Sequence, residues 1–251
     1  MRMMTFKATG NLGDNLQAVA LARLLGPASG WFRDQPEFTI DIDGPGVASG
    51  FLLGAQSYNP EKTFFSGIWY PAHNEAHVPW LRKTPWPIGA RDPVTLSRVA
   101  KAGMRVQLVG CPSLTLPKYI GPRFGEIYVD VKDGPGNDWS HSISPYLKLS
   151  EEWALAKCAL DRYARAALVH TSRLHVALPC VALGTPVRYL GPRDDRTSIL
   201  DTVGIPQGRE CSPDSSYWRE LFVDFIERNL GVKCQDGGYV TTPIPTVHHR
   251  A

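Results

Sequence analysis

Residues 168–175 of this chain (Leu-Val-His-Thr-Ser-Arg-Leu-His) join an apolar strand pattern to an arginine and a histidine. Thr171 or Ser172 is a suitable N-cap, so we expect a helix to begin at Arg173. An arginine beside the free N–H groups of a helix N-terminus can bind a carboxylate or a phosphate. A histidine two residues later, His175, can transfer a proton near neutral pH. The pattern predicts an anionic substrate held by Arg173 and acted on by His175; two solvated or capping side chains are the alternative.

A second motif, residues 10–14 (Gly-Asn-Leu-Gly-Asp), lies between a predicted strand and a predicted helix. Glycines at such a turn allow a ligand to approach the backbone, and the helix dipole favours an anion. Ligands of α/β sheets bind near the carboxyl ends of strands, so Asn11 and Asp14 are candidate substrate-binding residues. The alternative is a simple turn in which Asp14 caps the helix. The spacing is not that of a dinucleotide-binding fingerprint.

A third motif, residues 89–93 (Gly-Ala-Arg-Asp-Pro), also connects a predicted strand to a helix. Arg91 could reach a cleft between domains while Asp92 caps the following helix. The alternative is an Arg91–Asp92 surface ion pair, which would contribute little to stability.

Two patterns that could bind a metal are both weak, and we expect no metal site. Asp41 and Asp43 share one face of a predicted strand, but hard cations need more oxygen ligands than these two. His73 and His77 are four residues apart, but the flanking prolines disfavour a helix and a zinc site.

The composition is that of a globular protein, with 43% apolar and 20% charged residues in 251. The net charge is only +3 and no basic face is interleaved with aromatic residues, which disfavours nucleic-acid binding. No apolar run is long enough for a transmembrane helix or a signal peptide. Five widely spaced cysteines without a Cys-x-x-Cys pair indicate a reduced, cytoplasmic setting.

Strand and helix patterns alternate along the chain, which predicts an α/β fold with mainly parallel sheets. We expect two domains, residues 1–117 and 118–251, with a cleft between them. A last helix from about Tyr217 should pack back across the boundary, and the tail 237–251 should be poorly ordered. Residues 59–87 show no clear period and are predicted to be irregular loop. The remaining elements are expected as strands at 3–8, 38–42, 50–54, 87–90, 105–109, 126–131, 167–170 and 186–190, and as helices at 15–25, 95–102, 150–163, 173–183 and 217–230.

Taken together and in order, these motifs resemble the polysaccharide pyruvyl transferase family. The segments that carry the resemblance are residues 10–14, 87–92, 109–116 (Val-Gly-Cys-Pro-Ser-Leu-Thr-Leu), 163–166 (Tyr-Ala-Arg-Ala) and 171–175. The resemblance covers about residues 5–200. It implies two Rossmann-like domains in an arrangement similar to that of glycosyltransferase-B enzymes. The chain is short for the family, so the N-terminal, acceptor-side domain is expected to be reduced.

The resemblance also implies an activity, the transfer of pyruvate from phosphoenolpyruvate (PEP) onto a sugar as a ketal. PEP-binding residues of the family would correspond to Arg91, Arg173 and His175, with Leu174, Asn11 and Asp14 as further substrate-binding residues. PEP is then a co-substrate and no cofactor is implied. The acceptor would be a glycan, lipid-linked or not, and peripheral contact with a membrane stays open. A nucleotide-sugar glycosyltransferase and a non-catalytic carbohydrate- or protein-binding module remain alternatives.

Overall fold

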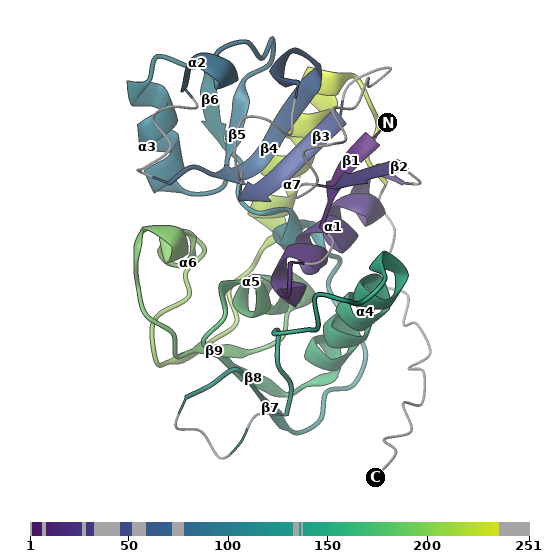
Figure 1. Cartoon of the computed structure of the whole chain (residues 1–251). Helices are drawn as coiled ribbons and strands as arrows, with labels where there is room; N and C mark the ends of the chain where they lie inside the picture. Colours follow the sequence, from purple (N-terminus) through teal and green to yellow (C-terminus); the bar gives the residue numbers. More distant parts are fainter. Residues whose placement is uncertain are drawn as a thin grey trace.

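The computed structural model describes residues 2–6, 9–26, 29–32, 46–51, 59–71, 78–132, 136 and 138–235. Within these residues the strands form two sheets, of six and four strands. Figure 1 shows the larger sheet above the smaller one, with helices α1 and α5 between them. The mixed α/β fold with parallel sheets that the sequence predicts is confirmed.

The first sheet is parallel throughout, in the order β2-β1-β3-β4-β5-β6. Its strands are β1 (Arg2–Thr5), β2 (Ser29–Phe32), β3 (Gly46–Phe51), β4 (Thr63–Trp69), β5 (Ile88–Ala90) and β6 (Val106–Leu108). The chain order reverses beside β1, and ligands of such sheets bind outside the carboxyl ends of the strands at this place.

The second sheet has the order β10-β9-β8-β7, and only β10 runs antiparallel to its neighbour. Its strands are β7 (Glu126–Val129), β8 (Leu168–Thr171), β9 (Val187–Tyr189) and β10 (Glu210–Cys211). Because β7, β8 and β9 are parallel neighbours, the segments that follow them in sequence meet at one edge of this sheet.

The described part of the chain contains seven α-helices and three 3-10 helices. The α-helices are α1 (Leu12–Leu25), α2 (Val78–Leu81), α3 (Pro93–Lys101), α4 (Leu149–Arg165), α5 (Leu174–Leu183), α6 (Ile199–Thr202) and α7 (Ser216–Leu230). The 3-10 helices are η2 (Pro60–Lys62), η4 (Pro112–Thr115) and η5 (Asp195–Thr197).

Helix α1 is apolar around most of its circumference because it lies between two hydrophobic cores. Leu12 and Leu16 pack into the core beside the second sheet. Leu21 and Leu24 pack into the core beneath the first sheet. A helix that is covered on opposite sides has no wide solvent-exposed face, which explains why apolar residues occur on several sides of α1.

The prediction that residues 59–87 form an irregular loop is wrong. This interval contains β4, which pairs with β3 and β5 inside the first sheet, and the short helix α2. Residues 63–68 of β4 are all buried. A strand covered on both faces does not alternate between apolar and polar residues, so its sequence lacks the period that marks a half-exposed strand.

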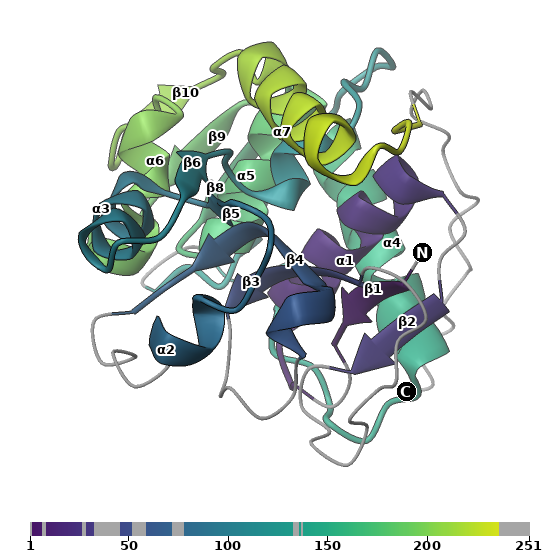
Figure 2. The same cartoon turned by 90° about the horizontal axis from the view of Figure 1, so that it is seen from above.

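The predicted boundary at residues 117/118 lies between the last strand of the first sheet and the first strand of the second. Helix α7 follows the second sheet in sequence but packs on the first, where the ring of Phe225 stacks on Phe64 with centroids 5.0 Å apart. Figure 2 shows α7 lying along the side of the molecule next to α1. Helix α1 packs into the core beside the second sheet, and α7 packs into the core of the first sheet, so each contacts the half of the chain to which it does not belong. The division into two domains therefore stays a prediction.

The N-terminal half holds the six-stranded sheet and the C-terminal half the four-stranded one. That the N-terminal half is reduced relative to the family stays a prediction. The predicted strand at 38–42 and the tail at 237–251 lie outside the described residues.

Candidate active site

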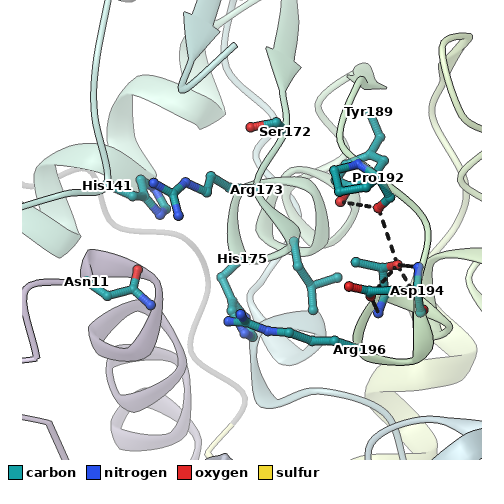
Figure 3. A pocket seen from close by; sticks show the side chains of 11 residues that line it. Asn11, His141, Ser172, Arg173, His175, Tyr189, Pro192, Asp194 and Arg196 are labelled. Atoms are coloured by element: carbon teal, nitrogen blue, oxygen red, sulfur yellow. Dashed lines mark hydrogen bonds between the residues drawn. The ribbon is translucent and has the colours of Figure 1, made fainter. Parts of the chain in front are cut away.

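A cavity of about 150 Å³ lies where the carboxyl ends of β7, β8 and β9 face α1 (Figure 3). Its lining comes from the segments that follow these strands and from the start of α1. The lining residues are Asn11, His141, Ser172, Arg173, Leu174, His175, Tyr189, Pro192, Asp194, Arg196 and Thr197. The parallel topology therefore assembles a polar site from four separate segments of the chain.

Arg173 is held in place at the start of α5. Its backbone N–H donates to Thr171 Oγ1 at 2.9 Å, and its Nε donates to Asp130 Oδ2 at 2.8 Å. The side chain of Arg173 is still 43% exposed. The guanidinium is thus oriented by a carboxylate but keeps donors for a second anion.

Asp130 follows β7 and organises this wall of the cavity. Its carboxylate accepts from Ser140 Oγ, the His141 N–H and Arg173, and its carbonyl accepts from Ser172 Oγ. Burial raises its pKa, but these hydrogen bonds and the Arg173 charge outweigh burial and lower the pKa below the usual value. Asp130 has φ = 50°, a left-handed conformation that aspartate and asparagine tolerate better than other side chains.

His175 lies at an irregular point of α5, with φ = −82° and ψ = 16°. The physical cause is Pro179, four residues later. Proline has no N–H to donate to the His175 carbonyl, and its ring pushes that carbonyl away. A proline inside a helix is expected to distort the turn before it, and here the distortion falls on the candidate catalytic residue.

The His175 imidazole is buried, and its Nδ1 has no hydrogen-bond partner among the described residues. Burial lowers the pKa of His175 well below its usual range, and the positive charges of Arg91 and Arg196 act in the same direction. The ring is therefore neutral near pH 7. A buried polar atom without a partner is costly, and a bound ligand would satisfy it.

His141 forms a second titratable group on the wall. Its Nε2 lies 2.5 Å from the hydroxyl of buried Tyr163. Burial lowers the pKa of His141 to about 4 and raises that of Tyr163 well above its usual value, so the pair is uncharged at neutral pH. The carbonyl of His141 also accepts from the Leu12 N–H at 2.9 Å, which fixes the start of α1 against the cavity.

Arg91 lies beside the cavity but is not part of its lining. It is 2% exposed, its Nε donates to Asp92 at 3.1 Å, and its Nη2 donates to the Arg196 carbonyl at 2.6 Å. Desolvation lowers its pKa, while the charge of Asp92 opposes that shift. The alternative of a surface Arg91–Asp92 pair is wrong, because both side chains are buried.

Four of the six candidate site residues line the cavity, namely Asn11, Arg173, Leu174 and His175. The other two are Arg91, described above, and Asp14, which is buried in the first turn of α1 without lining the cavity.

At two helices the N-cap is not the residue that the sequence predicts. The N-cap of α1 is Asn11, whose side chain accepts from the Gly13 N–H, and not Asp14. The N-cap of α5 is Arg173 itself, so Thr171 and Ser172 precede the cap. Thr171 instead accepts the Arg173 N–H as the last residue of its strand. By contrast, Asp92 caps α3 as predicted, with Oδ1 accepting from the Thr95 N–H at 2.8 Å.

Sequence reasoning missed His141, Asp130 and Arg196. A usable signal existed for Arg196, since residues 191–197 (Gly-Pro-Arg-Asp-Asp-Arg-Thr) follow a predicted strand and are rich in charge. His141 and Asp130 gave no such signal, because their role depends on the fold of the loop after β7.

The two weak metal patterns, Asp41 with Asp43 and His73 with His77, lie outside the described residues. Among the residues that are described, no group of three or more His, Cys, Asp or Glu side chains could hold a metal ion. In the same part of the chain, every helix is too short or too polar to cross a bilayer.

The chain matches the family model described as polysaccharide pyruvyl transferase over residues 52–194. No curated protein matches the chain. Among solved structures, a functionally uncharacterized protein from Klebsiella pneumoniae subsp. pneumoniae NTUH-K2044 is similar, with a TM-score of 0.55 and 14% identity. That similarity covers 80% of this chain and 88% of the other, and it supports the fold alone. A UDP-GlcNAc 2-epimerase from Neisseria meningitidis, bound to UDP-GlcNAc, has a TM-score of 0.41 and 10% identity over 90% of this chain and 92% of its own.

Proposed function

Because this chain belongs to the polysaccharide pyruvyl transferase family, we propose that it transfers pyruvate from PEP onto a glycan as a ketal. The reaction takes place in the cavity between α1 and the second sheet. The observation that carries the proposal is the placement of Arg173 and His175 on one cavity wall beside the Asn11 segment. These residues lie in two of the segments that resemble the family in sequence, residues 10–14 and 171–175.

The donor carries a carboxylate, a phosphate and an enol double bond. Arg173 binds one of the anionic groups through the donors that Asp130 leaves available. His175 gives a proton to the methylene carbon of PEP, which becomes a methyl group and leaves the adjacent carbon cationic. A sugar hydroxyl attacks that carbon and His175 accepts its proton, so the same imidazole acts first as acid and then as base.

The remaining steps close the ketal. The bond between the reacting carbon and the phosphate oxygen breaks, and the oxygen leaves with phosphate and the electron pair. A second sugar hydroxyl attacks the same carbon, and its proton leaves with the phosphate. The scheme requires neither a metal nor an organic cofactor. Burial of His175 and of the lining residues Leu174 and Tyr189 keeps water away from the cationic intermediate.

The acceptor belongs to a polysaccharide or a lipid-linked oligosaccharide, and the reaction takes place in the cytoplasm, where PEP is available. A lipid-linked acceptor would require the protein to associate peripherally with the membrane surface.

The experiment is a calorimetric titration of the protein with PEP, with nucleotide diphosphates and with glycans, followed by a phosphate-release assay with PEP and candidate acceptors. We expect PEP to bind, and phosphate to be released only when an acceptor is present. Binding of a nucleotide diphosphate without PEP binding would instead indicate a glycosyltransferase. Binding of a glycan with neither donor would indicate a non-catalytic module.

A further inference from the structure

Arg196 differs from Arg91 and Arg173, the two other arginines in or beside the cavity, because those two form ion pairs with aspartates. Arg173 is paired with Asp130 at 2.8 Å, and Arg91 is paired with Asp92 at 3.1 Å. No carboxylate pairs with Arg196 in the described part of the chain, although Arg196 lines the cavity. An arginine without a counter-charge on a cavity wall is suited to an anionic ligand.

The backbone that carries Arg196 is held firmly. Asp194 accepts from the Thr197 N–H at 2.9 Å and from the Thr197 hydroxyl at 3.0 Å, which closes the turn of η5. The Arg196 carbonyl accepts from Arg91, and neighbouring Asp195 pairs with Arg98. The turn after β9 is thereby fixed to the first sheet, while the guanidinium of Arg196 is left free of hydrogen bonds to that scaffold.

Neither Asp194 nor Asp195, both next to Arg196 in sequence, is seen to form an ion pair with it in the described part of the chain. Asp194 Oδ1 is engaged by the turn itself, and Asp195 is engaged by Arg98. The guanidinium of Arg196 instead lies over the ring of Trp69, 6.0 Å from its centroid. Arg91 lies 5.6 Å from the centroid of the same ring, so the indole holds two cations near each other.

The position of the Arg196 guanidinium relates it to His175. Figure 3 shows the Arg196 side chain extending toward the His175 imidazole, whereas Arg173 extends toward His141. The positive charges of Arg91 and Arg196 both contribute to the lowered pKa of His175. The His175 end of the cavity is therefore the more positive one, since the charge of Arg173 is balanced by Asp130.

We propose that Arg196 is a substrate-binding residue that holds the phosphate group of the donor beside His175, while Arg173 holds the carboxylate. The assignment rests on the proposed function for the identity of the donor. A phosphate monoester carries more negative charge than a carboxylate, so it is favoured at the end with unbalanced positive charge. The carboxylate suits Arg173, which acts as an oriented hydrogen-bond donor.

The placement also explains how a neutral His175 becomes an acid. A phosphate bound by Arg196 offsets the positive charges that keep His175 deprotonated, so donor binding is coupled to proton uptake. His175 then gives that proton to the methylene carbon of the donor. When the carbon–oxygen bond breaks, the phosphate already lies on Arg196, which stabilises the leaving group.

The test compares Arg196→Gln and Arg196→Lys with the matched control Arg193→Gln. Arg193 is three residues away on the same turn, lies over the ring of Tyr189 and donates to the Ile205 carbonyl, and is not part of the cavity lining. Calorimetry with PEP, inorganic phosphate and pyruvate measures affinity, and melting temperature shows that each variant is folded.

We expect Arg196→Gln to weaken PEP and phosphate binding at least about tenfold, as loss of a charged hydrogen-bond partner does. Pyruvate affinity should stay within about twofold, because the carboxylate site is intact. Arg196→Lys should lie between wild type and Arg196→Gln, and Arg193→Gln should bind all three ligands as wild type does.

Phosphate and PEP binding by a folded Arg196→Gln protein at the wild-type level would overturn the proposal. So would a wild-type protein that binds neither anion. If the wild-type protein binds inorganic phosphate but not PEP, and Arg196→Gln loses phosphate, the phosphate site stands and pyruvyl transfer is the part that fails.

Discussion

Gly13 in the first turn of α1 lies directly against His175 of α5. A Cβ atom at position 13 would be 2.9 Å from the Cβ of His175, closer than side chains normally approach. The glycine is therefore required by this contact between the two helices. The two helices come from different halves of the chain, so their packing fixes where the imidazole lies relative to Asn11.

Gly13→Ala should lower turnover by roughly 10- to 100-fold, because a small displacement of a catalytic group is enough to do so. Alanine favours the helical conformation over glycine by about 1 kcal/mol, which partly offsets the clash in stability. Turnover and melting temperature together test this. A variant with wild-type turnover would show that His175 can move without consequence.

Pro179→Ala should restore an N–H that can donate to the His175 carbonyl and make the first turn of α5 regular. We expect turnover to fall by on the order of 100-fold while the melting temperature changes by only a few degrees. The measurement is steady-state kinetics with a thermal melt. If the kink were unrelated to the reaction, turnover would follow stability and stay near the wild-type value.

Asp130→Asn removes the charge that orients Arg173 but keeps the side-chain shape, and asparagine also tolerates the positive φ. We expect kcat to fall roughly tenfold through poorer alignment, with no rise in KM for the donor because a negative charge is removed beside an anion site. Asp138→Asn is the matched control, since among the described residues the Asp138 carboxylate accepts from the backbone N–H of nearby Tyr128, at 2.8 Å. Equal effects at both positions would contradict a positioning role for Asp130.

Arg173→Lys and His175→Asn should separate binding from proton transfer. Lysine keeps the charge of Arg173 but lacks the planar fork, so PEP affinity should fall although the charge is unchanged. Asparagine cannot transfer the proton, so turnover should fall about 100- to 10,000-fold while PEP still binds. Affinity, turnover and melting temperature are measured for both. A folded His175→Asn protein with near-wild-type turnover would exclude a catalytic role for His175.

Acidification should destabilise the protein through His141. Its pKa is lowered from 6.5 to about 4 in the folded state, so between these values the unfolded chain binds more protons. Stability is therefore unaffected by His141 above this window and falls as the pH falls through it, by up to about 3 kcal/mol. Denaturant unfolding from pH 7 to pH 4 measures the loss.

The matched variant for the pH experiment is His141→Gln, which does not titrate but can still hydrogen-bond the hydroxyl of Tyr163. The loss of stability on acidification should be smaller in this variant. The loss that remains comes from His175, whose pKa is lowered in the same sense. Asp130, whose pKa is also lowered, contributes only at more acidic pH. An unchanged pH profile in His141→Gln would refute the assignment.

Local sequence was sufficient to predict candidate site residues and helix caps where a single segment contains both the end of a strand and the residues that follow it. Arg173 and His175 were identified in this way, because a strand and the helix after it place side chains at a sheet edge whatever the rest of the chain does. The same holds for Asp92 as the cap of α3, which depends on residues only three positions away.

The tertiary structure decided which of these edges share a cavity. Arg196 and His141 reach the site only because β7, β8 and β9 are parallel neighbours, and no local pattern specifies strand order. Strand β4 was missed because burial on both faces removes the alternation that reveals a strand. Arg91 was correctly placed at the end of β5, but its buried contacts with Asp92 and the Arg196 carbonyl put it beside the cavity. The sequence by itself thus determined the chemical groups and their local geometry. Long-range packing determined which of these groups face one another, because contacts across the cavity depend on residues far apart in the chain.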